Sequence, residues 1–179
     1  MTNTTATKDG SGKHALVLFS HGSLLCGSGE AVDAHAKRLQ KRGIWDVVRV
    51  GYLNYSEPLF AQTVEELAKE GATHITVLPY FLIPGYFVQK SLPETLAPVQ
   101  AAHPEITFDV APAIGFDISL ADALLESAHR AQGAETWRDP LTRAAQSCRP
   151  SRECPLYGTS ACPKVPSLPE GETKEKTNE

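Results

Sequence analysis

A histidine that could do chemistry stands directly after an apolar run of this 179-residue sequence. The run HALVLFS ends at Ser20 and is followed by His21, Gly22 and Ser23. Imidazole accepts protons or binds metal near neutral pH, and glycine lets backbone amides approach a ligand closely. The alternative is a histidine that bonds a backbone group or packs at a sheet edge. A phosphatase with a histidine nucleophile usually has Arg-His-Gly, whereas Ser20 precedes the histidine here.

A second group of candidates lies in PYFLIPGYFVQKSLPE, which begins like a buried strand and breaks at Pro84-Gly85. Beyond the break stand Tyr86 and Phe87, with Lys90 close behind. Aromatic rings beside a cation suit a large, flat, anionic ligand. The same rings could instead pack against a second subunit, and the two interpretations are compatible.

A third group lies in GYLNYSEP, at the end of another apolar run. Asn54 is a neutral donor and acceptor that could contact a ligand. The residues after it are typical of a helix start. Ser56 is a candidate N-cap, Glu57 would complement the helix dipole in the first turn, and Pro58 suits the same turn.

The pattern of apolar residues predicts alternating strands and helices that position these groups. Strands are expected at 14–20, 45–53, 74–82 and 106–114, and helices at 30–41, 57–69, 91–102 and 120–128. This alternation favours an α/β fold with a parallel sheet covered by helices on both faces. Right-handed crossovers then place loops 20–29, 52–57, 83–90 and 113–118 along one edge, where such folds bind ligands.

Composition excludes some function classes. A net charge of −4 and a pI near 5.9 argue against nucleic-acid binding and against binding to an anionic membrane. Residues 1–13 lack the apolar core of a signal peptide. No apolar run approaches the roughly 20 residues that cross a bilayer. We therefore expect a cytoplasmic protein that does not enter membranes.

Three cysteines lie late in the chain, at Cys148, Cys154 and Cys162. Their spacing does not match the two-residue gap of a zinc ribbon. Two of them precede proline, as iron–sulfur ligands often do, but a cluster usually takes four thiolates and the only other cysteine is Cys26. Either these cysteines bind a metal or an iron–sulfur cluster, or they are free thiols.

The chain is expected to contain one folded domain with two irregular ends. We predict a disordered N-terminus at 1–13, the α/β domain at 14–132, an irregular cysteine-containing segment at 133–166 and a disordered tail at 167–179. The last segment is rich in Glu, Lys, Thr and Pro and cannot bury enough apolar surface to order itself.

Four motifs in order, FSHGS, VGYLNYSEPLF, VLPYFLIPGYFV and SLPETL, resemble the sirohydrochlorin cobaltochelatase/ferrochelatase family over about residues 14–130. These are small class II chelatases of cobalamin and siroheme biosynthesis. The resemblance implies a flavodoxin-like half-lobe, often paired as a homodimer around a cleft. It also implies a lyase that inserts a divalent metal, Co²⁺ or Fe²⁺, into a sirohydrochlorin-type tetrapyrrole without ATP or an organic cofactor.

The resemblance also implies site residues. His21 falls on the family's first metal-binding histidine, so it is the predicted catalytic and metal residue. Phe87 occupies the place of the second histidine and Asn54 that of a frequent glutamate. The residues expected to bind substrate are Gly22, Ser23, Asn54, Gly85, Tyr86, Phe87 and Lys90. In a homodimer, His21 of each copy could face one cleft. The alternative function is a non-catalytic tetrapyrrole- or metal-binding protein with a degenerate site.

Overall fold

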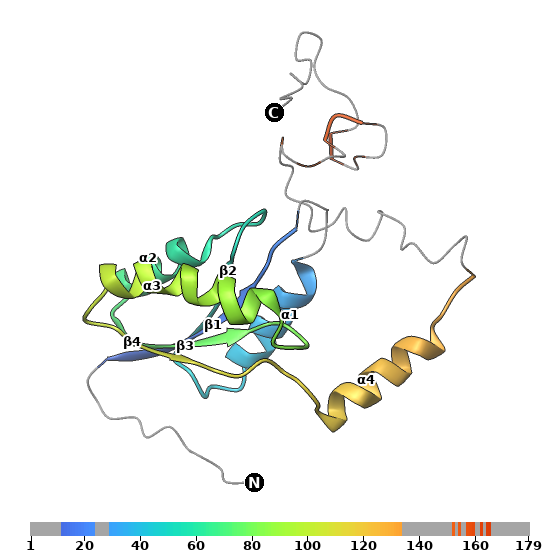
Figure 1. Cartoon of the computed structure of the whole chain (residues 1–179), viewed down its shortest axis with the longest axis horizontal. Helices are drawn as coiled ribbons and strands as arrows, with labels where there is room; N and C mark the ends of the chain where they lie inside the picture. Colours follow the sequence, from blue (N-terminus) through green and yellow to red (C-terminus); the bar gives the residue numbers. More distant parts are fainter. Residues whose placement is uncertain are drawn as a thin grey trace.

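The structure is a computed structural model that describes residues 12–23 and 29–133, together with 152, 154, 157–159, 162 and 164–165. Strands and helices alternate along the chain, as predicted (Figure 1). The elements are β1 (Lys13–Ser20), α1 (Glu30–Gln40), β2 (Val47–Tyr52), α2 (Phe60–Lys69), β3 (Ala72–Pro79), the π-helical turn η1 (Phe87–Ser91), α3 (Leu92–Ala102), β4 (Thr107–Val110) and α4 (Ile118–His129).

The four strands form one parallel sheet in the order β2-β1-β3-β4. Val17 in β1 lies opposite Arg49 of β2 on one side and Val77 of β3 on the other. Because all strands run in the same direction, their C-terminal ends meet at one edge. The predicted α/β fold is confirmed, and His21 follows the central strand β1 at that edge.

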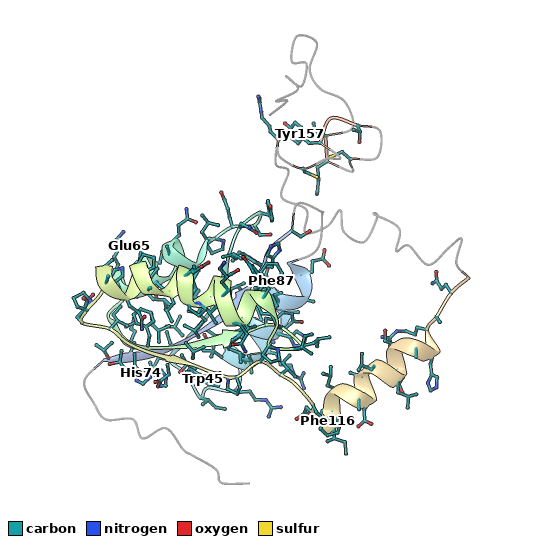
Figure 2. The ribbon with its side chains drawn as sticks, in the orientation of Figure 1. Trp45, Glu65, His74, Phe87, Phe116 and Tyr157 are labelled. Atoms are coloured by element: carbon teal, nitrogen blue, oxygen red, sulfur yellow. The ribbon has the colours of Figure 1, made fainter. Side chains whose placement is uncertain are left out.

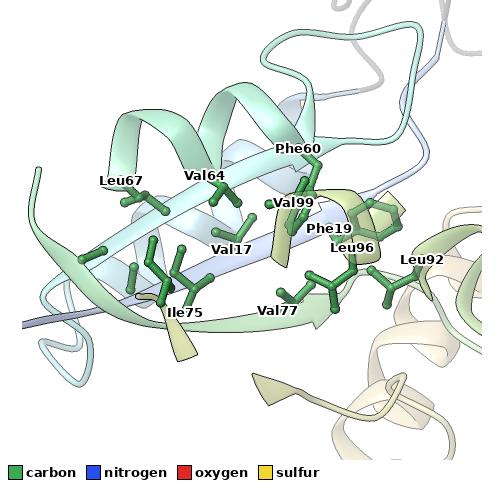
Figure 3. Close-up of a cluster of buried hydrophobic side chains, with 13 residues drawn as sticks. Val17, Phe19, Phe60, Val64, Leu67, Ile75, Val77, Leu92, Leu96 and Val99 are labelled. Carbon is green, nitrogen blue, oxygen red and sulfur yellow. The ribbon is translucent and has the colours of Figure 1, made fainter. Parts of the chain in front are cut away.

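The larger core lies between the sheet and helices α2 and α3 (Figure 3). Alternate residues of each strand point to this face, because side chains alternate along a strand. Gly51 of β2 allows α2 to approach, since a Cβ there would lie 3.0 Å from the Phe60 Cα. The fully buried members are Ala15, Val17, Phe19, Phe60, Val64, Leu67, Ile75 and Val77.

Helix α1 covers the opposite face with a smaller core. Val32 and Ala36 of α1 pack on Leu16 and Leu18 of β1 and on neighbouring β2 residues. Beyond the end of β3, Tyr80 packs against this cluster, whereas Phe81 packs against the larger one. Because side chains alternate along an extended chain, these two rings lie on opposite faces of the sheet.

Side chains bond the outer edge of β2, which is an edge strand of the sheet. The Gln40 side chain accepts a hydrogen bond from the Val48 amide at 2.6 Å and donates to the Asp46 carbonyl at 3.4 Å. The Thr63 hydroxyl donates to the Val50 carbonyl at 2.9 Å. These contacts occupy backbone groups that an exposed edge would offer to another strand.

The segment after β4 carries the chain away from the sheet. Ile114 donates its amide to the Phe81 carbonyl at 3.2 Å, and Gly115 donates to the Leu82 carbonyl at 2.8 Å. These bonds continue the contact between the segments that follow β3 and β4, beyond Val110. The predicted last helix is confirmed as α4, but it stands apart from the sheet and has no buried residue (Figure 1).

Two expectations about loops are wrong. Ser56 is not the N-cap of α2, and Glu57 is not in its first turn, because α2 begins at Phe60. The Gln62 side chain instead accepts from the Leu59 amide at 2.8 Å, while Ser56 contacts the loop after β1. The segment 83–90 is not a simple loop either, because the π-helical turn η1 starts within it. None of the described helices is long and apolar enough to span a membrane.

The protein is expected to become less stable as the pH is lowered, because of a histidine pair at the start of the sheet, where Figure 2 labels His74. The rings of His14 and His74 lie 4.3 Å apart, and His14 Nε2 lies 2.9 Å from the Thr76 hydroxyl. Burial, followed by the nearby His74, lowers the pKa of His14, although Asp46 and Asp109 oppose this. As the pH falls through 6.5, the ordinary pKa of histidine, the unfolded chain therefore binds a proton at His14 before the folded protein does.

The free energy of unfolding should thus be highest above this pH and should decrease between it and the lower pKa of folded His14. Urea denaturation across a pH series measures the slope. His14→Gln keeps a partner for Thr76 but cannot titrate, so its slope in this window should be shallower. An identical slope in both proteins would rule out this contribution.

Candidate functional site

The loops after β1 and β2 are joined by hydrogen bonds that position His21. Leu53 donates its amide to the Ser20 carbonyl at 2.8 Å, and Asn54 donates to the His21 carbonyl at 3.1 Å. The Ser23 amide donates to the Ser56 hydroxyl at 3.0 Å. The β1–β2 pairing therefore continues past the strand ends and brings the predicted residues His21, Ser23 and Asn54 together.

The imidazole of His21 is oriented by the backbone carbonyl of the next residue, Gly22. The ring is half-buried, and Nδ1 lies 3.0 Å from the Gly22 carbonyl oxygen. A carbonyl can only accept, so this contact assigns the proton of the neutral ring to Nδ1. Nε2 then keeps its lone pair, which makes it the atom of His21 that can bind a metal ion or accept a proton.

Aromatic rings from three segments surround this imidazole. The Phe87 ring of η1 lies 4.3 Å from the His21 ring, and the Tyr55 ring lies 5.5 Å from it. Phe81 stacks on Phe87 at 5.8 Å. Figure 2 labels Phe87 at the start of the helix that leads into α3. The predicted aromatic cluster is therefore next to His21, although η1 rather than an irregular loop supplies Phe87.

The outer part of the site carries an exposed ring and a cation. Tyr86 is 64% exposed and meets Phe87 edge-on at 5.9 Å. The Lys90 Nζ lies 5.6 Å from the centre of the Tyr86 ring, which is a cation–π geometry. Gly85 is exposed, and its carbonyl accepts the Val88 and Gln89 amides at the start of η1. This rim offers an accessible apolar surface beside a positive charge.

Tyr55 and Phe81 belong to the aromatic cluster, although neither was in the predicted set of site residues. Tyr55 directly follows Asn54 and has a positive φ of 58°, which an aromatic residue rarely adopts. Tyr80 and Phe81 are neighbours in the sequence, and only the face of the sheet that each occupies shows that Phe81 joins this cluster. The useful sequence signal was their position just beyond strand ends.

Asn54 carries an unsatisfied acceptor at this edge. Its Oδ1 atom is buried, yet it has no hydrogen-bond partner among the described residues. Such an atom normally costs free energy unless a partner arrives. The expected role of Asn54 in substrate binding stays a prediction that this unpaired oxygen supports.

Gly22 is required by the contact between the two loops. Its φ is +84°, and a Cβ there would collide with the Asn54 carbonyl oxygen. Gly22→Ala should therefore destabilise the fold by about 1–2 kcal/mol from the backbone alone, and more from the collision. Urea denaturation measures the loss. Gly43→Ala, which also has positive φ but nothing within 4 Å of the new Cβ, separates the backbone cost from the collision.

Equal losses in the Gly22→Ala and Gly43→Ala proteins would contradict a tight contact at Gly22. The expected difference is also functional, because only the change at Gly22 displaces the loop that carries His21.

A complete metal site is not formed by one copy of the described chain. Within the described residues, no three His, Cys, Asp or Glu side chains come together as a group that could hold a metal ion. Of the three late cysteines, for which metal or cluster binding and free thiols were the two alternatives, Cys154 and Cys162 are buried and free, whereas Cys148 lies outside the described residues. His21 is thus the one predicted metal ligand that the aromatic cluster contains.

A hollow of about 490 Å³ lies elsewhere, between α1 and β2. Its lining includes Lys37, Lys41 and Arg49, but no residue predicted for the site. The position of His21 at the C-terminal edge of a parallel sheet is the better guide to chemistry than this hollow, because ligands of open α/β sheets bind at that edge.

Comparison with known proteins agrees with this geometry. The CbiX family model matches residues 15–131, which is more than half of the sequence. The chain belongs to the CbiX family. The resemblance noted in the sequence is therefore confirmed, and the motifs around His21 lie within the matched range.

Named relatives of this CbiX-family chain are chelatases. It is 35% identical over 86 residues to sirohydrochlorin cobaltochelatase of Methanococcus aeolicus, covering 48% of this chain and 60% of the relative. The corresponding enzyme of Methanococcus maripaludis is 38% identical over 82 residues, covering 46% and 57%. Sirohydrochlorin ferrochelatase of Bacillus subtilis is 25% identical over 112 residues, covering 63% and 43%. The match thus spans about three fifths of the cobaltochelatases.

Solved structures share the fold. SirB, the sirohydrochlorin chelatase of Bacillus subtilis subspecies spizizenii in complex with cobalt, aligns with a TM-score of 0.61 and 24% identity, covering 75% of this chain and 61% of SirB. The CbiX protein of Marinobacter aquaeolei VT8, which is named for cobalamin (vitamin B12) biosynthesis, aligns with a TM-score of 0.51 and 22% identity. The alignment covers 66% of this chain and 99% of that protein. Both support the flavodoxin-like arrangement.

Proposed function

We propose that this protein is a sirohydrochlorin chelatase, an ATP-independent lyase that inserts Co²⁺ or Fe²⁺ into the tetrapyrrole. One observation carries the proposal: His21 presents the free lone pair of Nε2 beside Phe87 and Tyr55 at the ligand-binding edge of a CbiX-family sheet. The names of its cobalt- and iron-inserting relatives support both metals. Imidazole also accepts either ion, so the site itself does not select one.

The reaction exchanges a metal ion for two protons. The divalent metal binds the four ring nitrogens, and the two pyrrole N–H groups lose their protons, which finally pass to solvent. His21 Nε2 could carry the metal to the ring, accept a proton, or do both in turn. The metal is substrate here and no organic cofactor takes part.

The aromatic residues would hold the macrocycle in a reactive position. Tyr86 and Phe87 offer apolar surface against the ring face, and Lys90 can pair with a carboxylate of the substrate. Metal insertion needs the pyrrole lone pairs to tip towards the ion. Fixing the ring against Phe87 places those lone pairs next to the His21 imidazole, which replaces a random encounter by an oriented one.

The direct test is anaerobic incubation with sirohydrochlorin and each metal separately. We expect the absorption spectrum to change from that of the free to that of the metallated tetrapyrrole faster than in a protein-free mixture. No acceleration with Co²⁺ or Fe²⁺ would exclude the proposal.

A degenerate, non-catalytic binding protein is the second candidate, because Phe87 stands where the family has its second histidine. In that case sirohydrochlorin would bind and shift its spectrum, but metal insertion would proceed at the uncatalysed rate. The same incubation therefore separates the two candidates. An iron–sulfur cluster and a cytoplasmic location stay predictions, and neither proposal depends on them.

We further propose a homodimer that brings two His21 side chains to one cleft. Helix α4 exposes Ile118, Leu124 and Leu125 by 73%, 56% and 55%. A helix of this length is marginal alone and needs a packing partner. Light scattering after size-exclusion chromatography should give twice the 19.3 kDa mass of the chain. A monomeric mass in an active preparation would contradict the shared site.

A further inference from the structure

The hollow between α1 and β2 contains no residue of the proposed His21 site, and both of its elements are labelled in Figure 1. Its volume of about 490 Å³ is typical of pockets that hold small organic molecules. Ala36 of α1 and Val48 and Val50 of β2 supply an apolar floor. These three residues belong to the smaller core and are at most 8% exposed, so packing fixes the floor in place.

Two lysines from the end of α1 line the hollow. Lys37 and Lys41 are four residues apart, and the Lys41 amide donates to the Lys37 carbonyl at 3.2 Å, so both lie on one face of the helix. Both residues are exposed. No carboxylate of the described residues forms an ion pair with either ammonium group. Two positive charges therefore stand beside the apolar floor without a partner in the described part of the chain.

Strand β2 adds a third cation, Arg49. Its Nη1 donates to the Val48 carbonyl at 3.4 Å, and its Nη2 lies 3.3 Å from Glu70 Oε1. These contacts orient the guanidinium but use only part of its five N–H donors. Glu70 compensates Arg49 alone, and the lining holds one carboxylate, Asp33. Positive charge therefore prevails in the hollow, although the whole chain carries a net charge of −4.

The backbone of β2 that borders the hollow already has its hydrogen-bond partners. Gln40 accepts from the Val48 amide at 2.6 Å, and the Val48 carbonyl accepts from the arginine beside it. The Val50 carbonyl accepts from the Thr63 hydroxyl at 2.9 Å. An added peptide strand would need these same groups. The hollow thus suits a small molecule better than an extended peptide.

We propose that this hollow binds a small organic dianion, in which two carboxylate or phosphate groups are carried on a short apolar body. The anionic groups pair with Lys37 and Lys41, and Arg49 offers further donors. The apolar body covers the floor, which an inorganic ion would leave in contact with water. This dianion site is separate from the His21 site and does not rest on the chelatase proposal.

Titration of the full-length protein with isophthalate at low ionic strength, followed by amide NMR spectra, tests the dianion site. Isophthalate carries two carboxylates on a benzene ring. We expect saturable shifts at the amides of Lys37, Lys41 and residues 48–50, and none centred on Lys90 of the His21 site. Benzoate, with one carboxylate, should bind about tenfold more weakly, because it loses one charged contact. Inorganic phosphate should also bind more weakly, because it has no apolar body.

A matched pair of double variants separates contact with the lysines from net charge. Lys37→Gln/Lys41→Gln should weaken isophthalate binding by about tenfold or more. Arg38→Gln/Arg42→Gln removes the same charge from the same end of α1, but neither arginine lines the hollow. That variant should bind almost as tightly as the wild-type protein, and the same spectra show whether each variant is folded.

Four results would overturn the dianion site. Isophthalate could cause no saturable shifts, or it could shift amides around Lys90 rather than those of α1 and β2. The two double variants could weaken binding equally, which would mean that net charge alone attracts the probe. Phosphate could bind as tightly as isophthalate, which would mean that the apolar floor takes no part.

Discussion

Replacing His21 with alanine should lower the rate of Co²⁺ insertion into sirohydrochlorin by about 100-fold or more, the usual loss when a positioned acid–base group is removed. The reason is that His21 Nε2 holds the one free imidazole lone pair that the described aromatic cluster contains. Initial rates of the spectral change, measured anaerobically with saturating substrate, give the effect.

His35→Ala is a matched control for the loss of an imidazole. His35 lies on α1, and its ring is 5.7 Å from that of Tyr80, on the other face of the sheet from Phe81. This variant should insert Co²⁺ at close to the wild-type rate. If the His21→Ala protein kept the full rate, the imidazole would have no part in the reaction and the site proposed here would be wrong.

Phe87→His should strengthen Co²⁺ binding by about tenfold or more, equivalent to about 1.4 kcal/mol. The ring centres of Phe87 and His21 are 4.3 Å apart, so a new imidazole at 87 would stand within reach of an ion on His21 Nε2. Zinc and similar ions bind imidazole nitrogens at about 2.0–2.1 Å, and two imidazoles at this separation can reach the same ion. Isothermal titration calorimetry with Co²⁺ measures the gain.

Phe87→Leu controls for removal of the phenyl ring, because leucine fills the space without a ligand atom. It should leave Co²⁺ affinity unchanged and should weaken macrocycle binding, since the stacking of Phe81 on Phe87 is lost. The double variant His21→Ala/Phe87→His should lose the gain. Tight Co²⁺ binding in that double variant would show that the new histidine acts without His21.

These two results also bear on how one chain works with a single matched histidine. A large gain from Phe87→His in one copy would mean that the wild-type site is incomplete within the chain. In that case the homodimer, with His21 contributed twice, becomes the natural source of the second imidazole. Phe87 would then serve the macrocycle rather than the ion.

The fold was predictable from the sequence because apolar periodicity reports burial. The run HALVLFS became the buried central strand β1, and the predicted helix 91–102 became α3 almost residue for residue. The loop after β2 was less predictable. Ser56 reads as a helix cap in the sequence, but its hydroxyl bonds the Ser23 amide of a loop 33 residues away, a long-range contact that local propensity does not encode.

The sequence by itself determined the parallel α/β fold, the family motifs and the place of His21 at a strand end, because these depend on local spacing and on side-chain polarity. Only the tertiary structure decided that the Gly22 carbonyl directs the His21 proton to Nδ1, that Phe87 of η1 lies against the imidazole, and that α4 leaves the sheet. Those features depend on where backbone segments far apart in the chain meet. The pattern of residues along one segment does not specify which other segments lie next to it.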